Sequence, residues 1–256
     1  MGTARPVAPL TTQPKPASPR VAAVRLLEVD RELARRIGAD AAEARNAAVS
    51  GVVTLPRGRW DPLNAAARLR GGFGLLVLSG LVTRDVAGGE AVGAELVCQG
   101  DLLLPDDATE EHAVGLAPYW EVIEPCRLAV LDRGFVERVA PWPQIGAAMA
   151  ERVHRRAKRL SIALALGRLP RVEDRVHRLL WHLADRRGRV TSDGVVVPLP
   201  VTQEQLGRLV GARRPTVSLA LRGLRERGLV TRRSDDEWLL KHDPPAGIEP
   251  LHGGDA

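Results

Sequence analysis

The chain of 256 residues has few aromatic residues, few cysteines and no long hydrophobic run. Aromatic residues make up only 3%, while hydrophobic residues make up 45%, so any core must be built from Leu, Val and Ala. The two cysteines, Cys98 and Cys126, do not suggest a disulfide framework and are too few for an iron–sulfur cluster held by four thiolates. No apolar run approaches the roughly 20 residues that span a bilayer, and the N-terminus lacks the apolar core of a signal peptide. We therefore expect a cytoplasmic protein without membrane association.

The sequence also lacks the common signatures of catalysis and metal binding. It contains no nucleophile–base pair, no metal-ligand spacing and no glycine-rich phosphate loop. His112, beside Glu110 and Glu111, could ligate a haem or a metal, but a lone surface histidine explains it more simply. His154 and His177 are expected on solvated helix faces. We therefore expect no enzyme, and the sequence identifies neither a metal nor a cofactor.

The strongest positive pattern is a helix-turn-helix in residues 201–230. Thr202 is a good N-cap and Gln205 stands three residues later, which is the spacing of a capping box. Gly211 suits the end of this first helix, because glycine adopts the left-handed conformation without steric cost. Pro215 suits the first turn of the second helix, where its missing N–H is not needed. The first helix has an apolar stripe of Leu206, Leu209 and Val210, and the second has one of Val217, Leu221 and Leu224.

The exposed side of the second helix carries the residues expected to contact DNA. In helix-turn-helix proteins the N-terminal residues of this helix meet base edges in the major groove. An arginine can pair bidentately with guanine, and each such pair contributes about 1–3 kcal/mol of discrimination. A helical hairpin with a solvated basic face is the alternative, but caps, glycines and arginines together favour DNA binding. The predicted contacts on this helix are Arg213, Arg214, Pro215, Thr216, Ser218, Leu219 and Arg222, with Thr202 before the first helix.

Positive charge is concentrated in the C-terminal half of the chain. Residues 1–142 carry a net charge of −2, residues 143–170 of +5 and residues 171–242 of +6, while residues 243–256 carry −3. Such a segregation is the electrostatic footprint expected of a protein that binds phosphates. A basic face can also be merely solvated, so the charge supports the motif without proving it.

The remaining C-terminal residues predict a winged helix. An apolar stripe from Val172 to Leu183 indicates a helix before the motif, and residues 195–197 indicate a short strand. Residues 229–233 and 237–241 read as two strands around the turn at 234–236, which would be the wing. Arg232 and Arg233 could contact phosphates there, although simple solvent exposure explains them equally well.

Residues 143–166 predict one long helix with two possible roles. Ile145, Met149, Val153, Leu160 and Leu164 keep one side apolar, with Ala157 in the gap and arginines on the remaining sides. The helix could be an ordinary core helix or a dimerisation helix that packs against its copy. Proline and glycine on both flanks separate it from its neighbours, which favours dimerisation. A homodimer predicts a palindromic operator with half-sites about 34–36 Å apart.

The N-terminal half predicts a small β structure. Residues 1–20 contain five prolines and read as a disordered leader, and residues 25–48 suggest two short helices with Asp30 and Asp40 as N-caps. From Gly51 onward, short β segments alternate with turns, including Ser79-Gly80, which indicates a barrel or sandwich. The expected strands are residues 52–55, 75–78, 81–86, 94–97, 102–104, 120–123 and 128–131. The fold class is therefore α+β.

The segment LGRLVGARRPTVSLALRGLRERGLV is similar, almost position by position, to the helix-turn-helix of the Crp/Fnr family of bacterial transcription regulators. Arg214 falls where that family has its principal base-reading arginine. Pro215 falls where many members have a base-reading glutamate, and Leu219 where some have a second arginine. The resemblance implies that this chain reads a different target sequence from those members.

The N-terminal half resembles the cyclic-nucleotide-binding β-roll of the same family, in FGLLVLSGLVTRDV, QGD (residues 99–101) and CRLAVLD. The resemblance extends over residues 50–242 and implies a central dimerisation helix and a hinge at 167–170. The predicted division is a leader (1–20), a divergent sensor domain (21–140), a dimerisation helix and hinge (141–169), a winged helix-turn-helix domain (170–242) and a flexible tail (243–256). Cys98 and Cys126 could form a redox pair if the roll brings them together, but buried small hydrophobes are commoner.

The sequence departs from the family in the phosphate cassette. Cyclic-nucleotide binders carry Gly-Glu and later Arg-Ser/Thr-Ala after the mid-roll turn. The corresponding stretch here, residues 101–126, has no arginine and no Gly-Glu pair. That stretch is acidic instead, with Asp106, Asp107, Glu110 and Glu111, and would repel a phosphate. We therefore do not expect cyclic AMP or cyclic GMP as the ligand.

Three classes of function remain open. The first is a homodimeric, sequence-specific DNA-binding regulator whose effector is unidentified, with a cyclic-nucleotide-responsive regulator as its variant. The second is a constitutive or architectural DNA-binding protein whose roll does not sense. The third is an enzyme or small-molecule binding protein whose winged helix serves protein contacts. An activator would also contact RNA polymerase.

Overall fold

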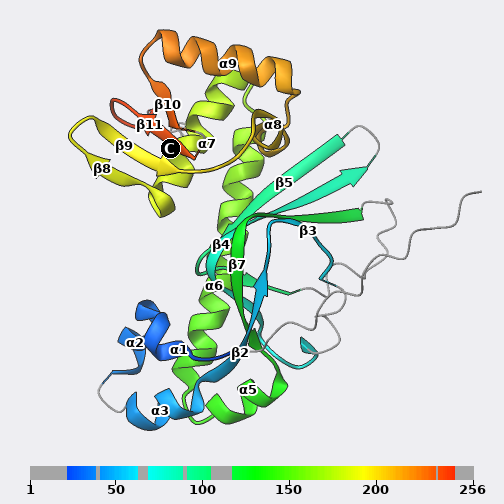
Figure 1. Cartoon of the computed structure of the whole chain (residues 1–256), viewed down its shortest axis with the longest axis vertical. Coiled ribbons are helices and arrows are strands. Elements are labelled where there is room, and N and C mark those ends of the chain that lie inside the picture. The colour runs from blue at the N-terminus through cyan, green and yellow to red at the C-terminus, as the bar shows by residue number, and fades with distance from the viewer. Residues whose placement is uncertain are drawn as a thin grey trace, which may run out of the picture.

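The structure is a computed structural model that describes residues 22–38, 41–62, 69–88, 91–104, 117–234 and 236–245. The predicted leader, most of the tail, the acidic stretch and His112 lie outside these residues. Figure 1 shows two lobes joined by one long helix, α6 (Pro143–Gly167). We call residues 22–142 the N-terminal lobe and residues 168–245 the C-terminal lobe.

The N-terminal lobe is an antiparallel sheet with short helices at its end (Figure 1). The strand order is β1-β2-β7-β4-β5, with β3 paired to β7 and β6 paired to β4. Asp30 caps α2 as predicted, because its carboxylate accepts a hydrogen bond from Leu33 N–H at 3.0 Å. The elements are β1 (Ala22–Arg25), α1 (Leu26–Val29), α2 (Arg31–Ile37), α3 (Ala41–Ala47), β2 (Val49–Leu55), β3 (Gly58–Trp60), β4 (Gly74–Gly88), β5 (Ala91–Cys98), β6 (Leu102–Leu103), β7 (Ala117–Leu131) and α5 (Arg133–Val139).

Two long strands replace four of the predicted short ones. β4 runs through the Ser79-Gly80 pair, so the turn predicted there is wrong. Gly80 has a φ of +97°, and a Cβ on it would lie 2.5 Å from the Pro125 carbonyl oxygen. The pairing of β4 with β7 shifts register at this point. The glycine therefore lets β7 approach β4 closely at a bulge. A Ser-Gly pair suits such a bulge as well as a turn, so the local sequence does not distinguish the two.

The strand order keeps Cys98 and Cys126 apart. Cys126 lies on β7 and Cys98 on β5, and β4 runs between these strands. Two strand spacings place the cysteines about 9–10 Å apart, beyond the reach of a disulfide. Both thiols are buried, and burial raises the pKa of Cys126 to about 12. The redox pair is therefore not formed, and the prediction of buried small hydrophobes is confirmed.

The central helix α6 has two different apolar parts. Ile145 and Met149 are 0% and 1% exposed and pack with Leu26, Leu33 and Phe135 inside the protomer. They cannot reach a second subunit, so their assignment to a dimer interface is wrong. The apolar periodicity gave the correct face, but the first two turns of that face are covered by the chain's own helices.

Further along α6 the apolar residues stay uncovered. Val153 is 42% exposed and Leu164 is 68% exposed, while Leu160 is partly buried and Ala157 is exposed. Arginines on the other sides of this helix bind groups of the N-terminal lobe. Arg152 pairs with Asp30 at 2.7 Å, and Arg156 pairs with Glu95 at 2.7 Å.

The C-terminal lobe is a helical layer against a small antiparallel sheet of order β10-β11-β9-β8. The wing is confirmed, since β10 and β11 pair from Val230↔Leu240 to Ser234↔Glu237. The core joins Val176 and Leu180 of α7 to Leu206 of α8 and to Val217 and Leu224 of α9. The elements are α7 (Val172–Arg187), β8 (Arg189–Thr191), β9 (Gly194–Pro198), α8 (Gln203–Val210), α9 (Arg214–Glu226), β10 (Val230–Ser234) and β11 (Glu237–Leu240).

The two lobes are in direct contact, and part of the contact is apolar. Leu81, Cys98 and Ile123 of the N-terminal lobe belong to the same buried cluster as the core of the C-terminal lobe. In Figure 1 the β4–β5 hairpin lies against the base of the C-terminal lobe, beside α8. The position of the helix-turn-helix is thus tied to the sheet as well as to α6.

Ion pairs complete the contact between the lobes. Arg186 of α7 donates to both oxygens of buried Asp101, at 3.1 and 3.0 Å, and Arg159 of α6 pairs with the same carboxylate. On α8, Arg208 pairs with Asp85 and donates to Glu121 at 3.2 Å. Burial raises the pKa of Asp85, and the charge of Arg208 opposes this rise.

None of the helices in the described ranges has the length and apolarity to cross a membrane.

Candidate nucleic-acid interface

The first helix of the helix-turn-helix, α8, begins and ends as the sequence predicts. The Thr202 hydroxyl accepts a hydrogen bond from Gln205 N–H at 3.1 Å, and the Gln205 side chain accepts one from Thr202 N–H at 2.8 Å. Gly211 ends the helix with φ +63° and ψ +44°. These bonds fix the entry into α8 and leave the hydroxyl hydrogen of Thr202, which is exposed, able to donate to a phosphate.

Gly207 of α8 allows the turn and α9 to pack closely against α8. A Cβ at this position would lie 2.5 Å from the Ala212 carbonyl oxygen and 3.6 Å from a methyl group of Val217 on α9. The first of these is backbone and cannot move aside. Because Gly207 has no side chain, the turn at Ala212 can lie directly against α8, and this fixes where α9 starts.

The second helix, α9, presents the predicted residues to solvent. Arg213 is its N-cap residue, Arg214 is the first helical residue, and Pro215 follows. Leu219 is 58% exposed although it is apolar, and the side chain of Arg222 is 60% exposed and only 3.9 Å from Glu226. The exposed residues among the predicted contacts on α9 and its N-cap are Arg213, Arg214, Pro215, Thr216, Ser218, Leu219 and Arg222.

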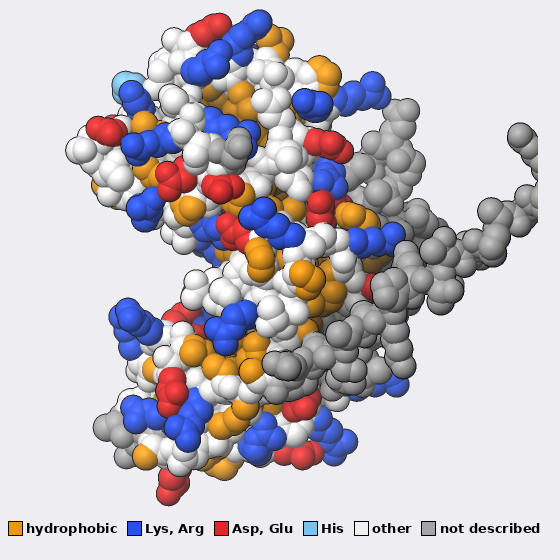
Figure 2. Space-filling view, in the orientation of Figure 1, with side chains coloured by type: hydrophobic (Ala, Val, Ile, Leu, Met, Phe, Trp, Pro, Cys, Tyr) orange, Lys and Arg blue, Asp and Glu red, His pale blue; other side chains and the backbone are white. Residues whose placement is uncertain are grey.

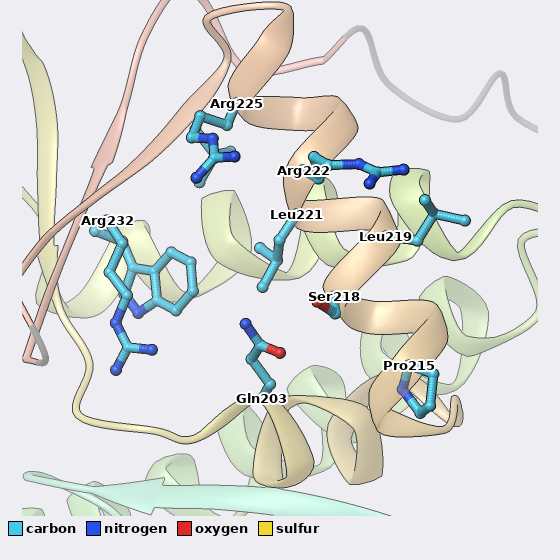
Figure 3. Close-up of a pocket in the computed structure, with 10 residues that line it drawn as sticks. Gln203, Pro215, Ser218, Leu219, Leu221, Arg222, Arg225 and Arg232 are labelled. Atoms are coloured by element: carbon cyan, nitrogen blue, oxygen red, sulfur yellow. The ribbon is translucent and has the colours of Figure 1, made fainter.

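This exposed face is hollowed between α9, the start of α8 and the wing. Figure 3 shows Gln203, Ser218, Arg222, Arg225 and Arg232 around a cavity of about 450 Å³. In Figure 2, Lys and Arg side chains lie over the top of the C-terminal lobe, where α9 runs. A concave surface with arginine, serine and glutamine side chains offers donors to phosphate and base acceptors.

The wing arginines occupy different environments. The Arg232 guanidinium lies 5.1 Å from the centre of the Trp238 ring, and its Nε donates to the Ser234 carbonyl oxygen at 3.2 Å. These contacts hold Arg232 on the edge of the same cavity. Arg233 is exposed on the same strand. Both are therefore on the surface, and Arg232 lines the cavity that residues of α9 also line.

Sequence reasoning missed two residues near this surface. Gln203 lines the cavity, and its place directly after the N-cap was a usable signal. Arg57, far away in the chain, lines an adjoining cavity together with Arg214 and Arg232. No local pattern around Arg57 points to nucleic acid, because only the contact between the lobes brings it there.

Other titratable groups in the described part of the chain do not assemble into a site. No group of three or more His, Cys, Asp or Glu residues there has a geometry that could hold a metal ion. His177 is half-buried, not solvated as predicted, and its Nε2 accepts a hydrogen bond from Trp181 Nε1 at 3.1 Å. Burial lowers the pKa of His177, and Arg227 and Arg178 lower it further.

Comparison with known proteins identifies the C-terminal lobe. Residues 174–246 match the family of Crp-like helix-turn-helix domains. No curated protein matches the sequence.

Several solved structures share the fold of most of this chain at low identity. A CooA mutant from Carboxydothermus hydrogenoformans matches at 18% identity and a TM-score of 0.56, covering 75% of this chain and 83% of that one. CLP of Xanthomonas campestris, described as a c-di-GMP-responsive global regulator, matches at 18% identity and a TM-score of 0.54, covering 83% and 100%. A cyclic nucleotide-binding domain containing protein from Listeria monocytogenes EGD-e matches at 14% identity and a TM-score of 0.60, covering 83% and 97%.

Proposed function

We propose that this protein is a sequence-specific transcription regulator. Its residues 174–246 match the Crp-like helix-turn-helix domain, and its fold is that of Crp/Fnr regulators. It acts as a homodimer in the cytoplasm and binds a palindromic double-stranded operator. The other predicted classes of function have less support.

The placement of Arg214 carries this proposal. It is the first residue of α9, it is exposed, and among the described residues it makes no hydrogen bond or ion pair. A guanidinium at the start of a recognition helix can reach the O6 and N7 atoms of a guanine. Leu219 follows on the same helix and suits contact with a thymine methyl group, while Pro215 can donate no hydrogen bond. The operator therefore contains guanine at the position that Arg214 reads.

The uncovered part of α6 supports the homodimer. Val153, Ala157, Leu160 and Leu164 recur at alternating steps of four and three residues, which is the repeat of a coiled-coil seam. Val153 and Leu164 are exposed in the single chain, at 42% and 68%. A second copy of α6 would cover this seam. Dimer symmetry then predicts two half-sites about 34–36 Å apart.

We further propose that neither cyclic AMP nor cyclic GMP is the effector. The arginine and the Gly-Glu pair of the phosphate cassette are absent from residues 101–126. Asp101, in the same turn, is 2% exposed and is engaged by the protein's own Arg159 and Arg186. A constitutive DNA-binding protein is the second candidate, because the protein's own ion pairs join the turn at Asp101 to α6 and α7.

The test compares the wild type with Arg214→Ala on DNA selected from a random duplex library by the wild type. Loss of one bidentate pair in each half-site removes about 2–6 kcal/mol of discrimination, roughly 30-fold to 10⁴-fold. We expect Arg214→Ala to bind selected and scrambled duplexes alike while it remains folded. Arg70→Ala, an exposed arginine at the α5 end of the N-terminal lobe, should keep the wild-type preference. A variant at Arg214 that retains full preference would overturn the proposal.

A further inference from the structure

An arginine of the N-terminal lobe lies beside the start of the recognition helix. Arg57 lies in the short turn between β2 and β3, followed by Gly58 with φ +119°. It is exposed, and within the described ranges it makes no hydrogen bond, ion pair or ring contact. A surface arginine needs no partner, so its position relative to other groups decides whether it has a role.

That position is the edge of the nucleic-acid interface. Arg57 lines a cavity of about 590 Å³ together with Thr202 at the start of α8, Arg214 of α9 and Arg232 of the wing. The remaining lining includes two exposed carboxylates, Glu204 and Asp236, so the arginines outnumber the acids by three to two. The cavity therefore combines residues from both lobes and has an excess of positive charge.

The contact between the lobes fixes the turn at this place. In the sheet, Gly58 pairs with Val122 and Arg59 pairs with Glu121. Glu121 in turn accepts a hydrogen bond from Arg208 of α8 at 3.2 Å. Arg57 thus lies two positions before Arg59, whose strand partner Glu121 is bonded to the helix-turn-helix. Strand register and this hydrogen bond therefore hold the backbone of the turn that carries Arg57 beside the helix-turn-helix.

We propose that Arg57 binds a backbone phosphate of the operator, next to the base that Arg214 reads. This inference rests on the proposed function, because a duplex seated on α9 must bring its phosphates past the cavity that Arg57 and Arg214 share. An arginine is suited to this contact because it presents a fixed fork of donors to phosphate oxygens. A phosphate contact adds affinity and fixes register but carries no sequence information.

The proposal gives the N-terminal lobe a direct part in DNA binding. The positive charge that meets DNA would come from two lobes, and its full extent exists only while the lobes are docked. Loss of the contact through Arg208 would therefore remove the contribution of Arg57 as well as moving the helices. Nothing in the sequence around Arg57 would indicate such a role.

The experiment measures equilibrium binding of wild type, Arg57→Ala, Arg57→Lys, Arg214→Ala and Arg70→Ala across a salt series. Each is measured on the selected duplex and on a scrambled duplex of the same length. We expect Arg57→Ala to weaken both duplexes by the same factor, roughly 3- to 10-fold per protomer, and to flatten the slope of log K against log salt by about 0.9 per protomer. Arg57→Lys should restore most of the slope, and Arg70→Ala should match the wild type.

The contacted phosphate can be located with the same proteins. Single phosphates of the selected duplex are replaced in turn by neutral methylphosphonates. One replacement in each half-site, next to the guanine that Arg214 reads, should weaken binding by the wild type as much as the Arg57→Ala substitution does. The same replacement should not weaken binding by the Arg57→Ala variant any further. Additive losses at every position would mean that no particular phosphate is contacted and would overturn the proposal.

Failure of this inference is distinguishable from failure of the proposed function. If Arg214→Ala loses sequence preference while Arg57→Ala keeps the wild-type affinity and salt slope, the regulator stands and the role of Arg57 is refuted. If the wild type itself shows no preference for any duplex, the proposed function fails first, and the inference fails with it.

Discussion

Asp101 joins three parts of the molecule, and its replacement tests whether that junction matters. Its carboxylate is 2% exposed and accepts hydrogen bonds from Cys98 N–H at 2.9 Å and from Arg186 at 3.0 and 3.1 Å, and it also pairs with Arg159. Asp101→Ala would leave the backbone donor and two guanidiniums without this acceptor. We expect the C-terminal lobe to lose much of its hold on the N-terminal lobe.

The magnitude follows from burial. Removing one partner of a buried ion pair costs about 3–5 kcal/mol, because the other charge is left uncompensated. The side chains of Arg159 and Arg186 are each 23% exposed, so water can replace part of the lost interaction. We therefore expect a loss of about 3 kcal/mol in the free energy of unfolding, at the lower end of that range.

The assay is urea unfolding followed by tryptophan fluorescence and by circular dichroism. The matched control is Glu137→Ala, which breaks an exposed ion pair with Arg133. The side chain of Arg133 is 76% exposed and that of Glu137 is 63% exposed. Exposed pairs contribute less than about 1 kcal/mol. If Asp101→Ala is no more destabilising than Glu137→Ala, the ion-pair junction does not hold the lobes together and this account of their contact is wrong.

Three further predictions concern the dimer, the helix turn and pH. Leu164→Glu should convert the dimer into a folded monomer in sedimentation velocity; a persistent dimer would contradict the proposed seam. Gly207→Ala should cost about 1–3 kcal/mol of stability, because its Cβ would meet the Ala212 carbonyl oxygen at 2.5 Å, and an unchanged thermal midpoint would contradict this. The pKa of His177 is lowered in the folded chain, chiefly by burial. Stability should therefore fall as the pH drops below about 6.5, where the unfolded chain binds the proton first, until the lower folded pKa is passed. His177→Gln should reduce this acid sensitivity in urea unfolding, and an equal loss in both proteins would argue against His177 as its source.

The sequence predicted the helix-turn-helix in detail because its signals are local. The capping box of Thr202 and Gln205 and the left-handed Gly211 each depend on neighbours within a few residues. The close approach at Gly207 is likewise set by the adjacent turn. Short-range hydrogen bonding and sterics therefore suffice to place the exposed face of α9.

The sequence failed where distant segments decide the outcome. The periodicity of α6 gave an apolar face but could not show that Ile145 and Met149 are covered by Phe135 and Leu26 of the same chain. A Ser-Gly pair predicted a turn at Gly80, where the approach of β7 makes a bulge in a continuous strand. The ion pairs of the α6 arginines could not be predicted either, because the partners Asp30 and Glu95 lie far away in the chain.

The most direct test of the central claim is selection of duplex DNA by the purified protein without added ligand. Fragments from a random library are bound at moderate salt, eluted and sequenced. We expect an inverted repeat with half-site centres about 34–36 Å apart and a guanine in each half-site that is lost when the selection is repeated with Arg214→Ala. Recovery of unrelated fragments by the wild type, with no shared repeat, would contradict sequence-specific binding by a ligand-free dimer.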